Sequence, residues 1–275
     1  MSWRLIDDGV VDIYRSLSVE EALAQANAAR ANKVNTLRFW IARPSVVLGR
    51  FQCLHEEVNI DFCRHEHISI ARRFTGGGTV YHDEGNLNFA LCMDQSQRYV
   101  PRTLPELYWT FIGGIARALQ QIGVPACFDA NRSCLRIRGK KITGTAGWIK
   151  RGVSFVHGTL LISADLEQLA RALDVPPGQP AYYREPNVWR CLESRRDIVT
   201  TIVREVPNPP TIEELKNAIV RFIERISGQT VERGELSADE RTVAEALYRD
   251  RYSRPEWNLG YRHQVSNLTA TESLQ

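Results

Sequence analysis

The stretch RRFTGGGTVYHDEGNLNF, residues 72–89, places three consecutive glycines between two strand-like segments and beside two arginines. Adjacent glycines lose much conformational entropy on folding, so a fold retains them where the backbone takes unusual angles or touches a ligand closely. The N–H groups of such a turn form a concave site for an anion. A tight hairpin turn with two surface arginines is the simpler alternative.

The arginines and the spacing of the glycines limit the kinds of ligand that this stretch can bind. Side chains alternate along a strand, so Arg72 and Arg73 point to opposite faces and we expect only one of them to reach a ligand. A guanidinium there could hold phosphate or carboxylate with two hydrogen bonds. The stretch has neither the GxxxxGK[ST] spacing of a Walker loop nor the GxGxxG fingerprint of dinucleotide-binding folds.

Around this stretch, β-branched and aromatic residues indicate several strands, which alternate with helical patterns. Residues 36–42 and 45–51 are predicted to form a hairpin or neighbouring strands, and residues 134–149 and 153–163 an antiparallel pair with a tight turn between them. The other predicted strands are 68–74, 79–82 and 87–93, and the predicted helices are 18–31, 104–122, 165–173 and 211–226, with a further helix before an irregular tail that carries Trp257. Strand clusters mixed with helices favour an α+β fold.

The length of the chain bounds its domain organisation. A chain of 275 residues fits one large domain or a domain with a small appendage. The proline-rich VPNPP segment at 206–210 predicts a surface loop. We therefore expect a main domain at 1–210 and a small helical C-terminal extension, 211–275, packed on the same domain.

Composition excludes some classes of protein. The net charge of +3 is too small to predict nucleic-acid binding. No apolar stretch approaches the ~20 residues of a membrane span, and the N-terminus does not resemble an export signal. The six cysteines have no CxxC spacing, which disfavours a zinc site. We expect a cytoplasmic protein whose thiols are reduced, with no nucleic-acid and no membrane partner.

A second charged segment, GKKITGTAG at 139–147, repeats the combination of basic residues and glycines. Lys140 and Lys141 face opposite ways on a strand, so one of them is expected to point inward. A lysine beside an α-phosphate would stabilise charge during attack on phosphorus, whereas two exposed lysines at a turn are the alternative. His157, in HGTLL at 157–161, would by itself most often be a satisfied interior histidine.

Taken in order, the segments ARRFTGGGTVYHDEGNLNF, GKKITGTAG and HGTLLIS resemble the catalytic domain of lipoate-protein ligases, in the biotin and lipoate ligase superfamily. The resemblance runs from about Trp3 to RYSRPEWNLG at 251–260. It implies a catalytic domain related to class II synthetases, with a mixed, largely antiparallel sheet flanked by helices. It also implies an enzyme that uses ATP and Mg²⁺ to convert lipoate, or octanoate, to acyl-AMP and then acylates a lysine of a lipoyl carrier protein.

The resemblance assigns roles by motif position. Lys141 matches the catalytic lysine that touches both the α-phosphate and the acyl carbonyl. The other positions that match nucleotide contacts for ATP or AMP are Arg73, Gly78, Thr79, Val80 and Tyr81. The residues expected to line the lipoyl pocket or its rim are Gly76, Gly77, His82, His157 and Gly158, with an apolar wall from Leu48, Gly49 and Phe51. Magnesium would be held mostly by water and phosphate oxygens, so no metal ligands are assigned, and Asp83 either supports the site or accepts N–H bonds in its own turn.

Two departures from the family pattern affect the expected partners. Long ligases carry a C-terminal accessory domain, whereas this chain stops shortly after EWNLG, so a separate accessory subunit is expected. The Asn-Asp pair of many members is replaced here by Asn131, Arg132 and Ser133. The carrier would be an E2 lipoyl domain, a glycine cleavage H-like protein or a dedicated lipoate-binding protein.

Three rival functions remain open at this stage. CFDA at 127–130 resembles the cysteine region of octanoyltransferases or lipoyl amidotransferases, in which a Cys127 thiolate would carry the acyl group. A biotin ligase is disfavoured because RRFTGGG lacks the arginine-glycine alternation of that loop. A binding or regulatory protein without catalytic activity would keep the fold, and the intact lysine segment argues against it.

Overall fold

The computed structural model describes residues 2–180 and 191–260. Its strands are β1 (Trp3–Val11), β2 (Thr36–Ala42), β3 (Ser45–Leu48), β4 (Ser69–Arg72), β5 (Val80–His82), β6 (Asn86–Asp94), β7 (Cys127–Asp129), β8 (Cys134–Ile137), β9 (Lys140–Lys141), β10 (Thr143–Lys150), β11 (Val153–Leu161) and β12 (Val231–Arg233). The helices are α1 (Ile13–Ala29), α2 (Leu54–Glu57), α3 (Ile60–His65), α4 (Leu104–Leu107), α5 (Gly113–Gln120), α6 (Leu166–Leu173), α7 (Ile202–Glu205), α8 (Ile212–Ser227), α9 (Ala238–Leu247) and α10 (Pro255–Leu259), with π-helical turns η1 (Tyr108–Ile112) and η2 (Tyr248–Tyr252).

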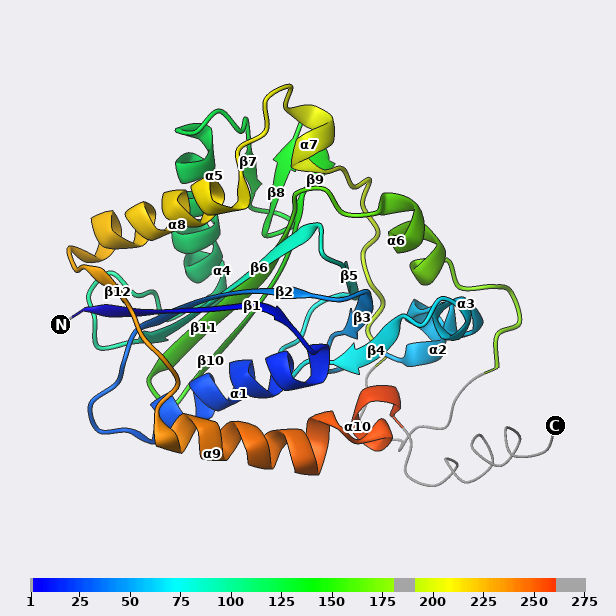
Figure 1. Cartoon of the computed structure of the whole chain (residues 1–275), viewed down its shortest axis with the longest axis horizontal. Coiled ribbons are helices and arrows are strands. Elements are labelled where there is room, and N and C mark those ends of the chain that lie inside the picture. The colour runs from blue at the N-terminus through cyan, green and yellow to red at the C-terminus, as the bar shows by residue number, and fades with distance from the viewer. Residues whose placement is uncertain (1, 181–190, 261–275) are drawn as a thin grey trace.

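The largest sheet has six strands in the order β10-β11-β6-β2-β1-β12. The first three neighbouring pairs are antiparallel, and the pairs β2/β1 and β1/β12 are parallel. Helices cover both faces: α5 and α8 lie on one side, and α1 and α9 on the other (Figure 1). The expected α+β fold with a mixed, largely antiparallel sheet is confirmed.

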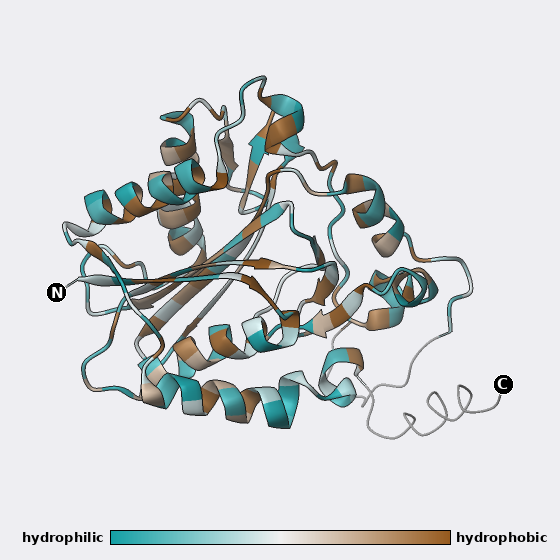
Figure 2. Ribbon diagram, in the orientation of Figure 1, coloured by the Kyte–Doolittle hydropathy of each residue, from teal (hydrophilic) through white to brown (hydrophobic). Residues whose placement is uncertain are grey.

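Both faces of the main sheet are buried because both carry apolar side chains. Along β6, Leu87, Phe89 and Leu91 join the core under α5 and α8, whereas Ala90 and Cys92 pack toward α1. Figure 2 shows the hydrophobic residues of the helices turned toward the sheet and the hydrophilic residues turned outward. A strand that is buried on both faces reads as a nearly continuous apolar run, as LNFALCM does apart from Asn88.

The two smaller sheets explain three errors in the predicted strands. β3 lies between β4 and β5, so the strands on either side of the glycines are not hairpin partners, and β2 and β3 belong to different sheets. The predicted strand at 134–149 is divided into β8, β9 and β10, because Arg138 and Gly139, both with positive φ, reverse the chain between β8 and β9. The predicted tight turn at 150–152 is confirmed between β10 and β11.

Two predicted helical features differ from the structure. Helix α1 begins at Ile13, because the Asp12 carboxylate accepts a hydrogen bond from the backbone N–H of Arg15, and Ser18 lies inside the helix instead of capping it. Trp257 belongs to α10, and its indole donates to the backbone carbonyl of Arg72. The chain after α9 is thereby fixed to the start of the glycine segment.

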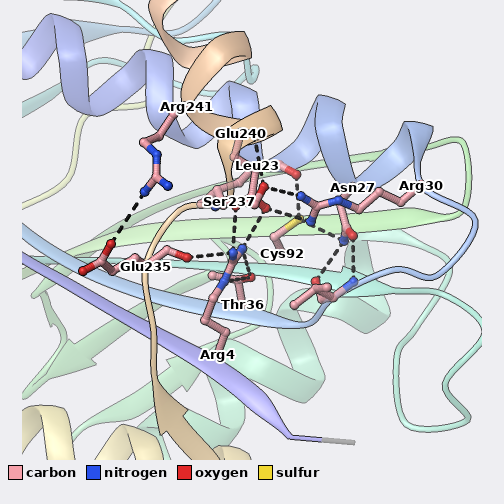
Figure 3. A network of polar contacts seen from close by, with 11 residues as sticks. Arg4, Leu23, Asn27, Arg30, Thr36, Cys92, Glu235, Ser237, Glu240 and Arg241 are labelled. Carbon is pink, nitrogen blue, oxygen red and sulfur yellow. Dashed lines mark hydrogen bonds and ion pairs between the residues drawn. The ribbon is translucent and has the colours of Figure 1, made fainter.

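Residues 211–260 pack on the same core as the rest of the chain. The buried face of α8 contributes Leu215, Ile219 and Phe222 to the core around α5, and β12 extends the main sheet beside β1. Figure 3 shows how the start of α9 is attached: the buried Glu240 carboxylate accepts hydrogen bonds from Arg4 and Arg30. Residues 261–275 of the predicted extension lie outside the described residues.

None of the helices in residues 2–180 and 191–260 has the length and hydrophobicity required to cross a membrane.

The contact between α5 and α8 yields a stability prediction. A Cβ added at Gly114 would lie 2.0 Å from Cζ of Phe222, whereas one added at the neighbouring Gly113 would lie 3.6 Å from its nearest atom. Gly114→Ala should therefore destabilise the protein by about 1–3 kcal/mol, measured by urea unfolding. The matched control Gly113→Ala should be neutral or stabilising, because alanine favours helix. Equal effects of the two substitutions would contradict this packing.

Candidate active site

A narrow cavity of about 30 Å³ lies on the α1 face of the main sheet. Its floor is a row of residues paired across four strands, Trp40 on β2, Asn88 on β6, Thr159 on β11 and Gly144 on β10. Directly paired residues in antiparallel strands share a face of the sheet, so this row presents its side chains together. In the adjacent row, Ala146 and His157 also line the cavity.

The walls come from α1 and the small sheet. Leu17 and Glu20 face the cavity from α1, and Val47, Val80 and His82 face it from β3 and β5. Because side chains alternate along β5, Tyr81 points away and packs with Leu54 and Cys63. Leu48 belongs to that same apolar cluster, and the apolar wall of this cavity comes from Leu17, Val47 and Val80. Gly49 and Phe51 lie beside the glycine turn, so their part in an acyl pocket stays a prediction.

Arg73 fixes the glycine turn from beneath. Its guanidinium donates to the carbonyl oxygens of Gly76 and Gly78, both at 2.7 Å, and to that of Val47 at 3.1 Å. Gly77 has φ of 91° and its carbonyl leaves no room for a Cβ at Gly49. Most donors of Arg73 are thus used by the backbone, and its charge lies directly under the turn. Burial lowers the pKa of Arg73 to about 10, so it stays protonated at neutral pH.

Arg72 is buried as well and faces away from the cavity. It donates to the carbonyl oxygens of Gly49, Gln52 and Trp257. Burial, together with the neighbouring charge of Arg73, lowers its pKa to about 9. The alternative of two surface arginines is therefore wrong, and of the pair only Arg73 lines the cavity.

A buried chain of polar groups runs along the cavity. Glu20 accepts from the indole of Trp40 at 3.1 Å and lies 2.7 Å from Nδ1 of His157, whose Nε2 is 2.8 Å from the hydroxyl of Thr75. Burial alone would raise the pKa of Glu20, but the charge of His157 and its hydrogen bond outweigh burial and lower it. His157 is therefore a satisfied interior histidine that also lines the cavity.

Sequence reasoning missed Glu20, Trp40 and Asn88. A glutamate that falls on the buried, alanine-rich side of helix α1, beside Leu17 and Ala24, was a signal that could have identified Glu20. Asn88 carried a signal of the same kind, because it is a polar residue inside the apolar run LNFALCM. Trp40 carried no such signal, because it sits in an apolar strand whose pairing the sequence does not reveal. For Asp83 the sequence left two roles open, which were support of the site and acceptance of N–H bonds in its own turn. The Asp83 carboxylate accepts hydrogen bonds from the backbone N–H groups of Gly85 and Asp165, both at 2.8 Å, so it has the second role.

One short segment connects the glycine turn to Lys141. The Ser194 hydroxyl accepts from the backbone N–H of Thr79 at 2.8 Å, and three residues later the Asp197 carboxylate lies 3.6 Å from Nζ of Lys141. Three residues span at most about 11 Å between Cα atoms, so the turn and Lys141 lie near the two ends of this segment. Lys141 does not line the narrow cavity itself.

Lys141 belongs to a cluster of charges. Arg132 and Arg136 also bind Asp197, and Arg136 binds Asp129 at 2.7 Å. Burial alone would raise the pKa of Asp197, but its hydrogen bonds with the two arginines and the charge of Lys141 lower it to about 2. Three cations thus face two carboxylates, which leaves net positive charge. Lys140 points the other way, to Glu205, so the expectation that the two lysines face opposite ways is confirmed. The role of Lys141 at a phosphate stays a prediction.

The cysteines depart in part from expectation. Cys53 and Cys191 form a disulfide, so the prediction of reduced thiols is wrong for this pair. Folding joins residues 138 positions apart, a proximity that spacing along the chain cannot predict. Cys127 is exposed on β7 and paired with Arg136, which is paired in turn with Lys141. Cys127, Arg136 and Lys141 therefore share one face of the small sheet β7-β8-β9.

The chain belongs to the family described as the lipoyl protein ligase A/B catalytic domain, whose model matches residues 12–224. It is 29% identical over 233 residues to lipoate-protein ligase A subunit 1 of Thermoplasma acidophilum, covering 82% of this chain and 84% of that protein. It is 34% identical over 238 residues to lipoate-protein ligase 1 of Staphylococcus aureus, and the match covers 86% of this chain and 67% of that protein. It is also 27% identical over 280 residues to octanoyltransferase LipM of Symbiobacterium thermophilum, covering 94% and 98%.

Solved structures agree with this assignment. A putative lipoate protein ligase of T. acidophilum with bound lipoic acid superimposes with a TM-score of 0.78 at 25% identity, over 95% of this chain and 100% of that one. A lipoate-protein ligase A bound with ATP superimposes with a TM-score of 0.78 at 26% identity, over 94% of this chain and 99% of that one. A bi-partite lipoate protein ligase studied with its E2 lipoyl domain, also from T. acidophilum, gives 0.78 at 28%, over 96% and 99%. The resemblance inferred from the glycine and lysine segments is confirmed.

The burial of His82 predicts a pH dependence of stability. Burial lowers its pKa to about 4 from the ordinary 6.5, so at pH 5 the unfolded chain binds a proton at this residue that the folded protein does not. The free energy of unfolding should therefore fall between pH 7 and pH 5, by roughly 1–2 kcal/mol from His82. Urea unfolding at both pH values checks this. His82→Gln should reduce the loss, whereas the exposed control His65→Gln should retain it, and an unchanged loss in His82→Gln would contradict the assignment.

Proposed function

We propose that this protein is an ATP-dependent lipoate-protein ligase that forms lipoyl-AMP and transfers the acyl group to a lysine of a lipoyl carrier protein. The observation that carries the proposal is the juxtaposition of a narrow cavity, the glycine turn over Arg73, and the Lys141 cluster along one segment. This arrangement places a cavity with an apolar wall at one end, where we propose that the acyl chain binds, and positive charge for a phosphate at the other. The ATP bound to one structural relative and the lipoic acid bound to another support these two ligands.

The chemistry requires two anions to meet. The carboxylate of lipoate attacks the α-phosphorus of ATP, pyrophosphate leaves, and a mixed anhydride forms. The carrier lysine then attacks the acyl carbonyl as a free amine, the amide forms, and AMP leaves. Lys141, Arg132 and the amides of the glycine turn would offset the repulsion in the first step, and Lys141 would stabilise the developing oxyanion in the second.

Magnesium requires a separate test of fit. The two carboxylates of the Lys141 cluster, Asp129 and Asp197, are already bound by arginines. Within the described ranges, the one group with metal-ligand spacing is Cys53, Glu56 and Cys191, whose sulfurs are joined to each other and do not suit a hard cation. The described residues thus supply no carboxylate site for Mg²⁺, and in our proposal phosphate oxygens and water would hold it.

The partners follow from the same reasoning. The proposed carrier is an E2 lipoyl domain or a related lipoyl carrier, in line with the bi-partite archaeal ligase studied with its E2 lipoyl domain. The similarity to a protein named subunit 1 supports a separate accessory subunit. Intact-mass analysis of a carrier domain incubated with this chain, lipoate and ATP-Mg, with and without that subunit, tests both points.

A second candidate function is octanoyl transfer through Cys127. Two observations favour it: Cys127 is exposed on the same face as Lys141, and a LipM relative matches nearly its full length. In this mechanism the Cys127 thiolate attacks an acyl thioester, releases the donor thiol, and passes the acyl group to the carrier lysine. Acylation would then need no ATP.

The two mechanisms predict opposite effects of single substitutions. In our proposal Lys141→Ala lowers lipoate-dependent exchange of labelled pyrophosphate into ATP by at least about 100-fold. The substitution removes the positive charge that would stabilise the α-phosphate while it is attacked. Lys140→Ala, the matched control on the opposite face, should retain exchange within about threefold, since Lys140 binds Glu205 in the structure.

Cys127→Ala completes that test. It should leave exchange and carrier acylation intact. If Cys127→Ala instead abolishes acylation and a mass shift places an acyl group on Cys127, the thiol mechanism replaces the ligase. Failure of both exchange and acyl transfer in the wild-type protein would support a binding role without catalysis.

A further inference from the structure

The Cys53–Cys191 disulfide fastens the start of the segment that connects the glycine turn to the Lys141 cluster. Cys191 lies three residues before Ser194 and six before Asp197, the two residues through which this segment contacts the turn and the cluster. The proposed function gives the disulfide no role. Because of its position, however, the disulfide is placed to control whether the segment stays against the turn.

Ser194 packs tightly against the glycine turn. Its hydroxyl accepts from the backbone N–H of Thr79 at 2.8 Å and from Nε2 of Gln52 at 2.9 Å, and it donates to the buried carboxylate of Glu57 at 2.5 Å. A Cβ added at Gly78 would lie 2.9 Å from the same oxygen. The hydroxyl thus uses its full hydrogen-bonding capacity, and the order of the turn depends on where this one residue lies.

The first half of the segment, residues 191–196, buries little apolar surface. The backbone N–H of Leu192 donates to the carbonyl of Phe51 at 3.1 Å, but the side chain of Leu192 is 50% exposed. Glu193, Arg195 and Arg196 are exposed as well. Segments that bury few apolar groups open locally at a small cost in free energy. We therefore expect the covalent link from Cys191 to be a large part of what holds this half in place.

The far end of the segment is anchored independently of the disulfide. The backbone N–H of Lys141 donates to the carbonyl of Ile198 at 2.8 Å, and that of Thr200 donates to the carbonyl of Lys141 at 2.9 Å. The Asp197 carboxylate is held in addition by two arginines. Loss of the disulfide would therefore free the Ser194 half of the segment and leave the attachment to β9 intact.

We propose that Cys53 and Cys191 form a reversible redox-modification site, in which the oxidised pair holds Ser194 on the glycine turn and reduction by a dithiol releases it. A thiolate of the dithiol attacks the sulfur of Cys191, which is partly exposed, and the buried Cys53 leaves as a thiolate and takes up a proton. The second thiol of the reductant then displaces Cys191 from the mixed disulfide. Two electrons pass to the protein, both cysteines end as thiols, and the reductant becomes a disulfide.

The consequence for activity rests on the proposed function, because it takes the glycine turn to be part of the ligase site. With Ser194 released, the N–H of Thr79 loses its acceptor and the turn loses the side chain that packs on Gly78. The amides of the turn would then be less well positioned for a phosphate, while the Lys141 cluster would keep its charge. The reduced protein should therefore retain its fold and lose catalytic efficiency.

Amide hydrogen exchange of the full chain, resolved by residue and without ATP, lipoate or carrier, tests the release itself. Addition of dithiothreitol should accelerate exchange at Thr79 and Leu192 by at least about tenfold, because both N–H groups lose their partners. Thr200 and Phe89 should keep their protection. The first is anchored to β9, and the second lies in a strand that is paired on both sides in the main sheet.

Three variants separate a specific release from general loosening. The double variant Cys53→Ser, Cys191→Ser should show the fast exchange at Thr79 without dithiothreitol and no further response to it. Ser194→Ala should make exchange at Thr79 fast in both redox states, because the acceptor is removed while the disulfide remains. Cys127→Ser, which removes the exposed free thiol on β7, should keep the full response of the wild-type protein.

Unchanged exchange at Thr79 on reduction would overturn the inference and leave the disulfide as a structural link only. Equal acceleration at Thr79 and Phe89 would also overturn it, since that result means that the whole fold opens. A full response to dithiothreitol at Thr79 in Ser194→Ala would contradict the proposed route through Ser194.

Activity is measured separately, in the pyrophosphate exchange reaction with lipoate. No dithiol is added, because it would also reduce the ring disulfide of lipoate, so the oxidised wild-type protein is compared with the double serine variant. The variant should be at least about fivefold slower. An equal rate would overturn the link between this site and activity. A wild-type protein whose amide exchange responds to reduction but which exchanges no pyrophosphate would contradict the proposed function and leave the redox site standing.

Discussion

The buried guanidinium of Arg73 holds the functional site together. It binds three backbone carbonyls and the Thr75 hydroxyl, and none of the described carboxylates forms an ion pair with it. A cation buried in this way is costly unless its donors are fully used, and the carbonyls of the glycine turn satisfy them. With the carbonyls of Gly76 and Gly78 directed inward, the turn is fixed above a positive charge. This constraint explains why small residues and a buried arginine occur together.

Around that anchor, the sheet places polar groups at defined depths. Register aligns Trp40, Asn88, Thr159 and Gly144 in one row, and the Glu20–His157–Thr75 chain lies beside the next. The charged part of the site is built on a separate small sheet, where Asp197 gathers Lys141 and two arginines. The cavity and the charge cluster are thus carried by different layers, and the segment from Ser194 to Asp197 connects them. An acyl group and a phosphate could each be held by its own layer.

The same architecture is compatible with both of the acyl-transfer chemistries that we propose as candidates. Cys127 shares the face of the small sheet that carries Lys141, so a thiol and a lysine are both near the place where an activated acyl group would lie. Positive charge stabilises an adenylate oxyanion and a thioester oxyanion alike. The donor that the site binds would decide between the two proposed reactions, because the fold alone does not specify the chemistry.

The sequence alone determined the class of fold and the family, and it predicted the segments of the candidate site, because glycines, adjacent basic residues and strand periodicity are local signals. It also indicated that the two members of each charged pair point to opposite faces, since alternation along a strand is a local property. It did not predict that Arg72 and Arg73 are both buried. The tertiary structure decided which strands pair, and thereby placed Trp40, Asn88 and Thr159 in one row, directed Tyr81 into the cluster with Leu54 and Cys63, and joined Cys53 to Cys191. These outcomes depend on contacts between residues far apart in the chain, which hydrophobic periodicity leaves unspecified.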